Sequence, residues 1–225
     1  MRLLTLGTGS KGNSYVLSDD DGNSLILDAG VSIEAIKKAL DFNFQSVSGV
    51  LISHGHKDHV LCADALEYYG LDVWKPYVWD DGLDRITLGA YAVSSFPVNH
   101  DTEPCTGFLI RHTSGFRMIY ATDLSYTKYI FSKFKADCIL VECNYMDEYV
   151  NPELEYLRHK VCGHFSLKNC KEFIKVNQTD NLKTIILCHM SFSSCDGAES
   201  IKQIKEIVGD GVNVFIATPE EVVEL

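Results

Sequence analysis

Four potential metal ligands lie within six consecutive residues of this chain. The segment "ISHGHKDHV", residues 52–60, carries His54, His56, Asp58 and His59, and these include three of the eight histidines in the sequence. The apolar residues before them read as a buried strand, so the four side chains follow a strand end. Alternation along an extended segment puts His54 and His56 on one side, and a turn would bring Asp58 and His59 toward a second point nearby. Imidazole and carboxylate ligands suit zinc, manganese and iron, so the H-x-H-x-D-H pattern predicts a metal centre.

A glycine-rich loop near the N-terminus is a second candidate for chemistry. Residues 7–12, "GTGSKG", match the G-x-G-x-x-G pattern of a dinucleotide-binding loop and follow a predicted strand. That pattern requires a helix directly after the loop, whereas residues 14–17 and 24–27 are both strand-like. We therefore reject a dinucleotide cofactor and keep a tight ligand-facing loop, whose candidate substrate-binding residues are Gly9, Ser10 and Asn13.

Short strands dominate the predicted secondary structure. Apolar or alternating runs between turn residues predict strands at 3–6, 14–17, 24–28, 49–53, 73–79, 91–98, 107–111, 117–121, 138–142, 184–188 and 213–217. Serine N-caps and apolar spacing predict helices at 32–40, 64–69, 166–177 and 196–208. Hairpins followed by helices occur in both halves, which predicts two packed sheets with helices outside.

Composition limits the class of protein. The 225 residues contain no linker-like stretch and no repeat, so we expect a single domain over residues 1–225. Glycines interrupt the N-terminal apolar run too early for a signal peptide or a membrane span, so we expect a cytoplasmic protein without a membrane partner. The eight cysteines form no C-x-x-C pair, and we expect them to be reduced and mostly small core residues.

The formal net charge of -11 disfavours non-specific binding to long polyanions unless positive charge is concentrated somewhere. Residues 158–175 concentrate it, with five Lys and Arg residues against the single acid Glu172. Lys168, Lys171 and Lys175 share one face of the predicted helix. Both an ordinary solvated helix face and a face that tracks a polynucleotide backbone fit this pattern.

Taken with "SHGHKDH", the remaining motifs resemble the metallo-β-lactamase-fold hydrolases. Each lies at or just after a predicted strand end, in the family's order: "LILDAG" with Asp28, "VNHD" with His100, "YATDLSY" with Asp123, "VECNY" with Glu142, "CGHFS" with His164 and "ILCHMS" with His189. The segments "GTGSKGN" and "GHFSLKN" look most like the YycJ (WalJ)-type branch of metal-dependent nucleases, which is related to the ribonuclease Z and cyclic-nucleotide phosphodiesterase branches. The resemblance implies an α/β fold, a four-layer αββα sandwich.

The resemblance also implies two divalent metal ions. His54, His56 and His100 would hold the first ion, Asp58, His59 and His189 would hold the second, and Asp123 would bridge both. Asp28 and Glu142 would orient ligand imidazoles, and His164 would act on the phosphate and the leaving group. The catalytic candidates are His164, Asp58 and Glu142, and Ser166 and Lys168 join the substrate-binding candidates because a helix N-terminus there would favour an anion.

A pair of ions implies a hydrolytic mechanism. Ions about 3.5–4 Å apart lower the pKa of a bridging water and supply hydroxide at neutral pH. We expect phosphodiester hydrolysis, by a nuclease or a phosphodiesterase. Net acidity and small size keep a cyclic-nucleotide phosphodiesterase as the rival. A lactone, ester or thioester hydrolase and a non-catalytic metal-binding protein are further alternatives, and the sequence leaves open zinc, manganese or iron and whether a homodimer forms.

Two features depart from the family pattern. Most members have a glycine shortly after the "HKDH" segment, whereas this chain has Val60, Leu61 and Cys62, and we expect Cys62 to be a small buried thiol. His112 and His159 match no family position, and we expect both to be ordinary surface residues.

Overall fold

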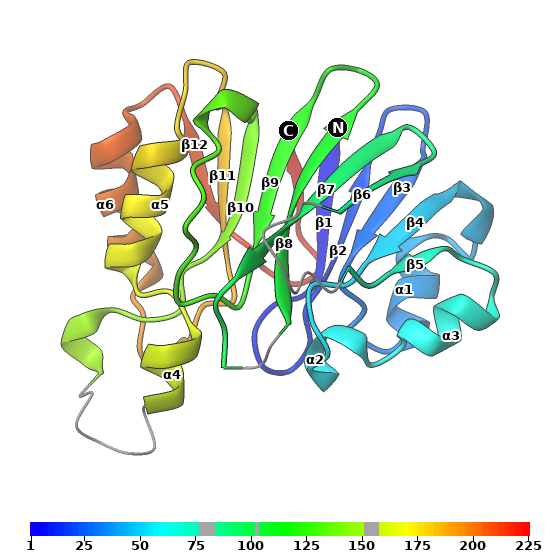
Figure 1. Ribbon diagram of the computed structural model, residues 1–225, viewed down its shortest axis with the longest axis horizontal. Coiled ribbons are helices and arrows are strands. Elements are labelled where there is room, and N and C mark those ends of the chain that lie inside the picture. The colour runs from blue at the N-terminus through cyan, green and yellow to red at the C-terminus, as the bar shows by residue number, and fades with distance from the viewer. Residues whose placement is uncertain (77–83, 102–103, 151–157) are drawn as a thin grey trace.

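Two β-sheets face each other in the computed structural model, which describes residues 1–225 except 77–83, 102–103 and 151–157 and the side chains of 158 and 159 (Figure 1). The six-stranded sheet has the order β13-β1-β2-β3-β4-β5, with β1 (Arg2–Gly7), β2 (Ser14–Ser18), β3 (Ser24–Leu27), β4 (Val47–Leu51), β5 (Val73–Trp74) and β13 (Val222–Glu224). The seven-stranded sheet has the order β12-β11-β10-β9-β8-β7-β6, with β6 (Arg85–Leu88), β7 (Tyr91–Val98), β8 (Cys105–His112), β9 (Arg117–Ala121), β10 (Cys138–Glu142), β11 (Thr184–Cys188) and β12 (Asn213–Ile216).

Helices lie on the outer side of each sheet. The covering helices are α1 (Ile33–Ala39) and α3 (Ala63–Tyr68) on the first sheet and α5 (Leu167–Asn177) and α6 (Gly197–Val208) on the second. Helices α2 (Lys57–Val60) and α4 (Arg158–Gly163) lie at the lower edge in Figure 1, and short 3-10 helices are η1 (Phe44–Ser46), η2 (Ser132–Phe134) and η3 (Asp147–Tyr149). Side-chain oxygens of Ser32 and Ser166 cap α1 and α5 by accepting backbone N–H bonds, as predicted, and Asp196, which was not predicted as a cap, does the same for α6. Among the described residues, no helix is long and apolar enough to cross a membrane.

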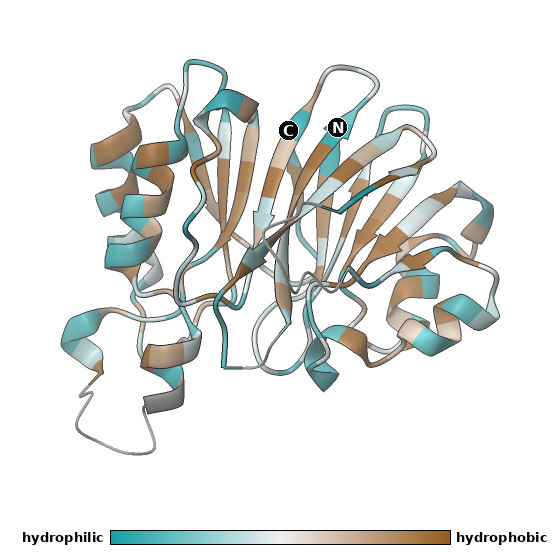
Figure 2. Ribbon diagram, viewed as in Figure 1, coloured by the Kyte–Doolittle hydropathy of each residue, from teal (hydrophilic) through white to brown (hydrophobic). Residues whose placement is uncertain are grey.

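Hydrophobic residues are concentrated in the strands and on parts of the helices beside them (Figure 2), and the packing of these residues defines four layers. Residues of both sheets, such as Leu27 and Leu140, form one buried cluster between them. The other face of the first sheet packs on α1 and α3 through residues such as Ile36, and the other face of the second sheet packs on α5 and α6 through residues such as Ile204. The fold is therefore the predicted αββα sandwich.

The predicted strands and helices are confirmed, with differences at short elements. The prediction for residues 73–79 is confirmed only at β5, and residues 77–79 lie outside the described residues. The edge strands β6 and β13, the single turn α2 and the short helix α4 were not predicted. Each has six residues or fewer, which is too short to show a hydrophobic period.

The strands bring the predicted ligands to one edge of the sandwich. Because β3 and β4 are parallel, and β9, β10 and β11 are parallel, the C-terminal ends within each group lie side by side. Strand β7 is antiparallel to β8, which is antiparallel to β9, so β7 ends at the same edge as β9. The glycine-rich loop joins β1 directly to β2, as expected for a loop without a dinucleotide-binding helix.

The packing between the sheets predicts a large stability loss when a central ring is removed. Phe108 is fully buried, and its ring centroid lies 5.9 Å from that of Trp74 and 6.2 Å from that of Tyr120. We expect Phe108→Ala to lower the free energy of unfolding by about 3–5 kcal/mol, measured by urea denaturation. Phe192→Ala is the control, because Phe192 is 87% exposed and its loss should change stability by about 0.5 kcal/mol or less. Equal losses in the two variants would contradict this account of the core.

Candidate metal centre

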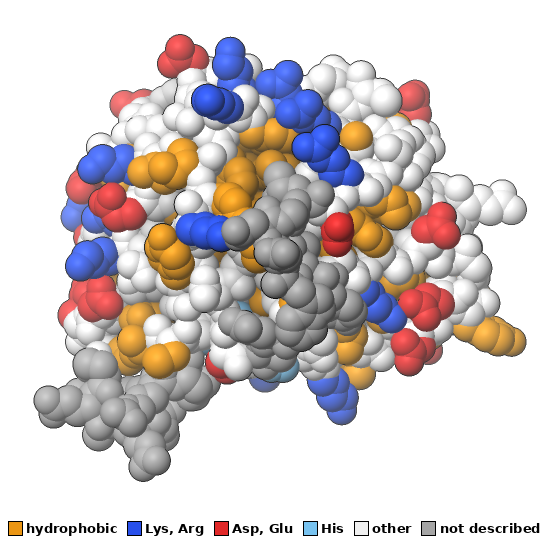
Figure 3. Space-filling model, viewed as in Figure 1, with side chains coloured by type: hydrophobic (Ala, Val, Ile, Leu, Met, Phe, Trp, Pro, Cys, Tyr) orange, Lys and Arg blue, Asp and Glu red, His pale blue; other side chains and the backbone are white. Residues whose placement is uncertain are grey.

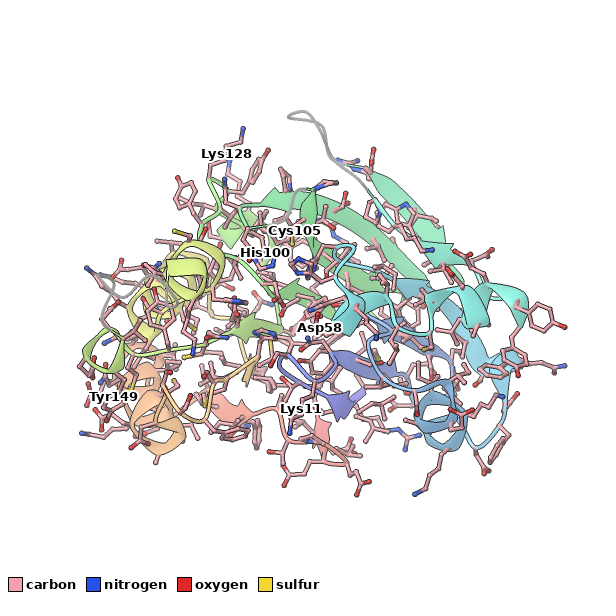
Figure 4. All side chains as sticks on the ribbon, turned by 90° about the horizontal axis from the view of Figure 1, so that it is seen from below. Lys11, Asp58, His100, Cys105, Lys128 and Tyr149 are labelled. Atoms are coloured by element: carbon pink, nitrogen blue, oxygen red, sulfur yellow. The ribbon has the colours of Figure 1, made fainter. Side chains whose placement is uncertain are left out.

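Side chains from both sheets meet at the edge where the strands end. Figure 4 views this edge from below and shows His100, which follows β7, and Asp58, which lies in α2, near the middle of the molecule. Lys128 and Tyr149 lie toward its periphery in the same view. The site is thus built across the two sheets.

Three histidines form the first group. The Nε2 atom of His54 lies 3.0 Å from Nδ1 of His56, and Nε2 of His100 lies 3.4 Å from the same atom. Nδ1 of His100 faces the carbonyl oxygen of Gly163 at 2.7 Å, which turns its Nε2 toward the other two rings. Three ring nitrogens at these distances can share one cation.

The second group contains one carboxylate and two histidines. Nε2 of His59 lies 3.7 Å from Oδ2 of Asp58, and ligand atoms of Asp58, His59 and His189 all lie within 4.8 Å of one another. Gly30 packs directly against the backbone at Asp58, where a Cβ atom on residue 30 would come within 1.6 Å of the Asp58 carbonyl oxygen. A glycine is therefore required there to hold Asp58 in place.

Asp123 lies between the two groups. Its Oδ2 atom is 3.2 Å from Nε2 of His59, and its Oδ1 atom is 3.5 Å from Nε2 of His189 and 4.0 Å from Nε2 of His100. Thr122 donates a 2.7 Å hydrogen bond to Oδ2, which fixes the carboxylate. The position between both groups is the one that a bridging ligand needs.

Asp28 and Glu142 contact the back of the ligand rings. Nδ1 of His59 lies 2.9 Å from Oδ2 of Asp28, and Nδ1 of His189 lies 2.9 Å from Oε1 of Glu142. Tyr120, from the opposite sheet, donates a hydrogen bond to Asp28. Both carboxylates therefore leave Nε2 of their histidine facing the centre, as in metal sites where an outer carboxylate orients a ligand.

His164 shares the Glu142 carboxylate with His189. Its Nδ1 atom lies 2.7 Å from Oε1 of Glu142 and 3.7 Å from Oδ1 of Asp123. The rings of His164 and His189 are stacked, with centroids 5.1 Å apart. His164 is thus held at the edge of the centre, at the N-terminal side of α5.

The protonation equilibria reflect burial and mutual charge. Burial, with help from His59, lowers the pKa of His54 to about 2. Burial alone would raise the pKa of Asp123, but His189 and His59 outweigh it and hold that pKa well below its usual range. Burial lowers and Glu142 raises the pKa of His164, with a net result of about 9. The buried carboxylates are therefore stabilised by positive charge in the centre, from protonated imidazoles or from bound cations.

The residues fit divalent cations. Nε2 of His189 is buried and has no hydrogen-bond partner among the described residues, although it faces Asp123 and the second group. An unpaired buried ring nitrogen is costly in a folded protein unless something else binds it. Imidazoles and carboxylates at these distances are a donor set for zinc, manganese or iron, which meets the requirement.

The predicted substrate-binding residues are only partly brought to this site. Asn13 lies beside the second group, with Nδ2 2.9 Å from Nε2 of His59 and 3.4 Å from Oδ2 of Asp58, and its Oδ1 accepts a 2.7 Å bond from the Gly9 N–H. Ser10 is exposed on the same loop. Ser166 is buried as the N-cap of α5 and accepts a bond from the Asn169 N–H, and Lys168, two residues later, is exposed.

The three lysines of α5 differ in their surroundings. Lys171 donates a 2.8 Å hydrogen bond to Oε1 of Gln203 on α6, whereas Lys168 and Lys175 are exposed. Whether Lys168 and Lys175 contact a polynucleotide stays a prediction. Arg158, part of the same basic run, has a side chain outside the described residues.

Two further expectations concern Cys62 and His112. Cys62 is buried, as expected, and its backbone φ of -120° needs no glycine, so the absent glycine does not disturb this loop. The expectation for His112 is wrong: its side chain is 7% exposed and lies against Asp19 at 3.2 Å, because the β8–β9 hairpin folds its ring onto Tyr91. The His159 side chain lies outside the described residues.

Sequence reasoning missed several residues that support the centre. Ser53 donates from its backbone and its hydroxyl to Asp28, and Asn144 donates to the backbone carbonyl of His189. Both lie inside motifs identified in the sequence, "SHGHKDH" and "VECNY", so their position next to predicted site residues could have indicated a role in the site. Tyr120 likewise lies inside "YATDLSY", but that motif does not indicate its partner, because Asp28 is 92 residues away in sequence.

Comparison with known proteins gives one family model and several relatives. The model of the anti-Pycsar protein Apyc1 matches residues 1–74. The exodeoxyribonuclease YycJ of Bacillus anthracis is 27% identical over 251 aligned residues, covering 94% of this chain and 92% of the relative.

Solved structures share the fold at low sequence identity. The metallo-β-lactamase fold protein YhfI from Bacillus subtilis has a TM-score of 0.73 at 17% identity, with 99% of each chain covered. The short form of human tRNase Z has a TM-score of 0.63 at 16% identity, covering 100% of this chain and 99% of the other. The chain therefore has the metallo-β-lactamase fold, and its predicted resemblance to the YycJ-type branch is confirmed by similarity over nearly its whole length.

Proposed function

We propose that this chain is a phosphodiester hydrolase that depends on two divalent metal ions and acts on polynucleotides. The observation that carries the proposal is the position of Asp123 between two groups of ring nitrogens and carboxylate oxygens. The similarity to an exodeoxyribonuclease over 94% of the chain supports a nucleic-acid substrate.

The protein supplies positioning and charge around the cleaved bond. Bound divalent ions lower the pKa of a water molecule and neutralise negative charge on phosphoryl oxygens. Asp28 and Glu142 hold the rings of His59 and His189 in one orientation through hydrogen bonds of 2.9 Å. Asn13 lies within 2.9 Å of His59 and is tied to Gly9, so the glycine-rich loop closes one side of the site.

His164 is the proposed proton donor to the leaving oxygen. Its Nδ1 atom is held by Glu142, so its Nε2 atom remains to contact the substrate. The ring is partly exposed, with 14% of the side chain accessible, unlike the fully buried ring of His59. Exposure at the rim of a buried centre suits a group that must reach a bound substrate.

Charge keeps a small nucleotide as the second candidate substrate. The net charge of -11 opposes long polyanions. On the face seen in Figure 3, most Lys and Arg side chains lie over the upper part, whereas the ligand-bearing edge lies below. A cyclic mononucleotide carries little charge and would not need a long basic surface.

Metal content provides the first test. We expect two zinc or manganese ions per chain by elemental analysis, about one after His100→Ala, and fewer than one after Asp123→Asn, because Asp123 contacts both groups. His112→Ala is the matched control, since it removes a histidine that lies in the β8–β9 hairpin, away from the ligands. That control should lower stability without changing metal content. Two ions in Asp123→Asn would contradict the bridging assignment.

Substrate preference provides the second test. With zinc or manganese bound, we expect hydrolysis of bis(p-nitrophenyl) phosphate and of end-labelled DNA to exceed that of cyclic mononucleotides and carboxyl esters. A chelator should abolish the activity, and Asp123→Asn should reduce it more than about 100-fold, because losses of outer ligand partners alone reach that size. Faster opening of a cyclic mononucleotide than of DNA would establish the second candidate. Ester hydrolysis without diester hydrolysis would end both.

The role of His164 predicts a dependence on the leaving group. His164→Ala should slow DNA cleavage by roughly 10²–10⁴-fold, because an alkoxide leaves poorly without a proton. Bis(p-nitrophenyl) phosphate, whose leaving group needs no proton, should lose much less. Metal content, measured in parallel, should remain that of the wild type. Equal losses on both substrates together with loss of metal would make His164 a metal ligand instead.

A further inference from the structure

One lysine near the centre has no counter-ion among the described residues. Lys160 lies on α4, and its ammonium group donates hydrogen bonds of 2.8 Å to Ser191 Oγ and 3.0 Å to Ser194 Oγ. No carboxylate of the described residues lies within ion-pair distance of it. Burial lowers the pKa of Lys160, so its charge is already partly desolvated.

This arrangement is unusual for a half-buried charge. Desolvating an ammonium group is costly unless an opposite charge compensates it. Lys75, another partly buried lysine, lies 2.8 Å from Glu67. Cys195 lies near Lys160, but its hydrogen bond to Cys143 and its burial raise the pKa of its thiol, so it stays neutral. Among the described residues, Lys160 therefore keeps an uncompensated positive charge.

The hydroxyl groups around Lys160 are suited to an anion. Each serine oxygen that accepts from the ammonium retains a hydrogen that it can donate. Ser193 extends the cluster, with its Oγ 3.3 Å from Ser191 Oγ and 3.4 Å from Ser194 Oγ. Three hydroxyls and one ammonium thus present several donors and no carboxylate.

Backbone bonds hold this cluster beside the metal centre. The N–H of His164 donates to the Lys160 carbonyl oxygen at 3.0 Å. The N–H of Ser191 donates to the Asn144 carbonyl oxygen at 3.0 Å, and Asn144 in turn bonds the His189 carbonyl at 2.8 Å. Lys160 and Ser191 are therefore placed next to His164 and His189 without being ligands.

We propose that Lys160, Ser191 and Ser194 bind a phosphate of the substrate other than the one that is cleaved. This inference rests on the proposed function and deepens it. Lysine binds phosphate as a point charge, and the serine hydroxyls complete the contacts to its oxygens. A second phosphate subsite requires a substrate with more than one phosphate, a condition that an oligonucleotide meets and a cyclic mononucleotide does not.

Binding to the metal-loaded protein tests the subsite apart from turnover. The probe is a fluorescent single-stranded oligonucleotide with cleavage-resistant phosphorothioate linkages, followed by anisotropy at several salt concentrations. Lys160→Met should weaken binding roughly tenfold to 100-fold. It should also reduce the slope of log affinity against log salt by about 0.7, the value for one lost contact on a single strand. Lys160→Arg should retain most of the affinity.

The control removes the same charge elsewhere. Lys37 on α1, which covers the first sheet, also donates to a neutral side-chain acceptor, the Tyr69 hydroxyl, so Lys37→Met should leave affinity and salt slope near those of the wild type. Equal weakening by Lys160→Met and Lys37→Met would show a bulk charge effect and overturn the proposal. Ser191→Ala with Ser194→Ala should weaken binding while keeping the charge, and unchanged binding in that variant would also count against it.

Two further comparisons separate the outcomes. Oligonucleotides that end in a 5′-phosphate or in a 5′-hydroxyl distinguish a terminal phosphate from an internal one. If Lys160→Met removes a preference for the 5′-phosphate, the subsite binds the terminal phosphate. If Lys160→Met weakens the binding of both oligonucleotides equally, the subsite binds an internal phosphate of the strand. If the wild type hydrolyses no diester, the proposed function fails, yet the anisotropy difference still decides the subsite. A loss of bis(p-nitrophenyl) phosphate turnover as large as the loss of oligonucleotide binding would place Lys160 at the cleaved phosphate and overturn the inference.

Discussion

A buried imidazole needs a partner for each ring nitrogen, and this requirement organises the whole edge of the sandwich. One nitrogen of His59, His100 and His189 faces an oxygen of the protein, from Asp28, Gly163 and Glu142 respectively. The other nitrogen of each ring then has to face the common centre at Asp123. The orienting carboxylates are themselves held by the backbone: the N–H groups of Leu124 and Phe165 donate to Glu142. The rings of His59 and His189 are therefore connected through a carboxylate to the backbone of the strands and loops.

The centre also depends on closure of the two sheets. His54 and His59 follow a strand of the first sheet, whereas His100, Asp123 and His189 follow strands of the second. Asp28, Asp123 and His189 have positive φ values of 58°, 50° and 50°. Such a conformation costs about 1–2 kcal/mol for a residue with a Cβ atom, and it is retained where surrounding bonds determine it. At each position the chain leaves a strand abruptly and turns a side chain inward.

The electrostatic character of the molecule differs between its surface and this edge. The whole chain has a formal net charge of -11, and four of its carboxylates, those of Asp28, Asp58, Asp123 and Glu142, are gathered around the histidine rings of the centre. Cations are the natural complement of such a cluster. Beside the centre, Lys160, Ser191 and Ser194 form the proposed phosphate subsite. Such a subsite would let an acidic protein bind a nucleic-acid strand through local positive charge, although its overall charge is negative.

The sequence by itself determined which residues are candidate ligands, and it determined most of the framework. Histidines and carboxylates at strand ends are a local pattern, as are the alternating strands and the caps at Ser32 and Ser166, because these signals depend on neighbours a few residues away. Only the tertiary structure decided which polar groups support the ligands. Tyr120 reaches Asp28 from the opposite sheet, and Lys171 turns to Gln203 on another helix. The burial of His112 and the grouping of Lys160 with Ser191 likewise join residues distant in sequence. Such contacts are set by packing between elements, which has no period along the chain.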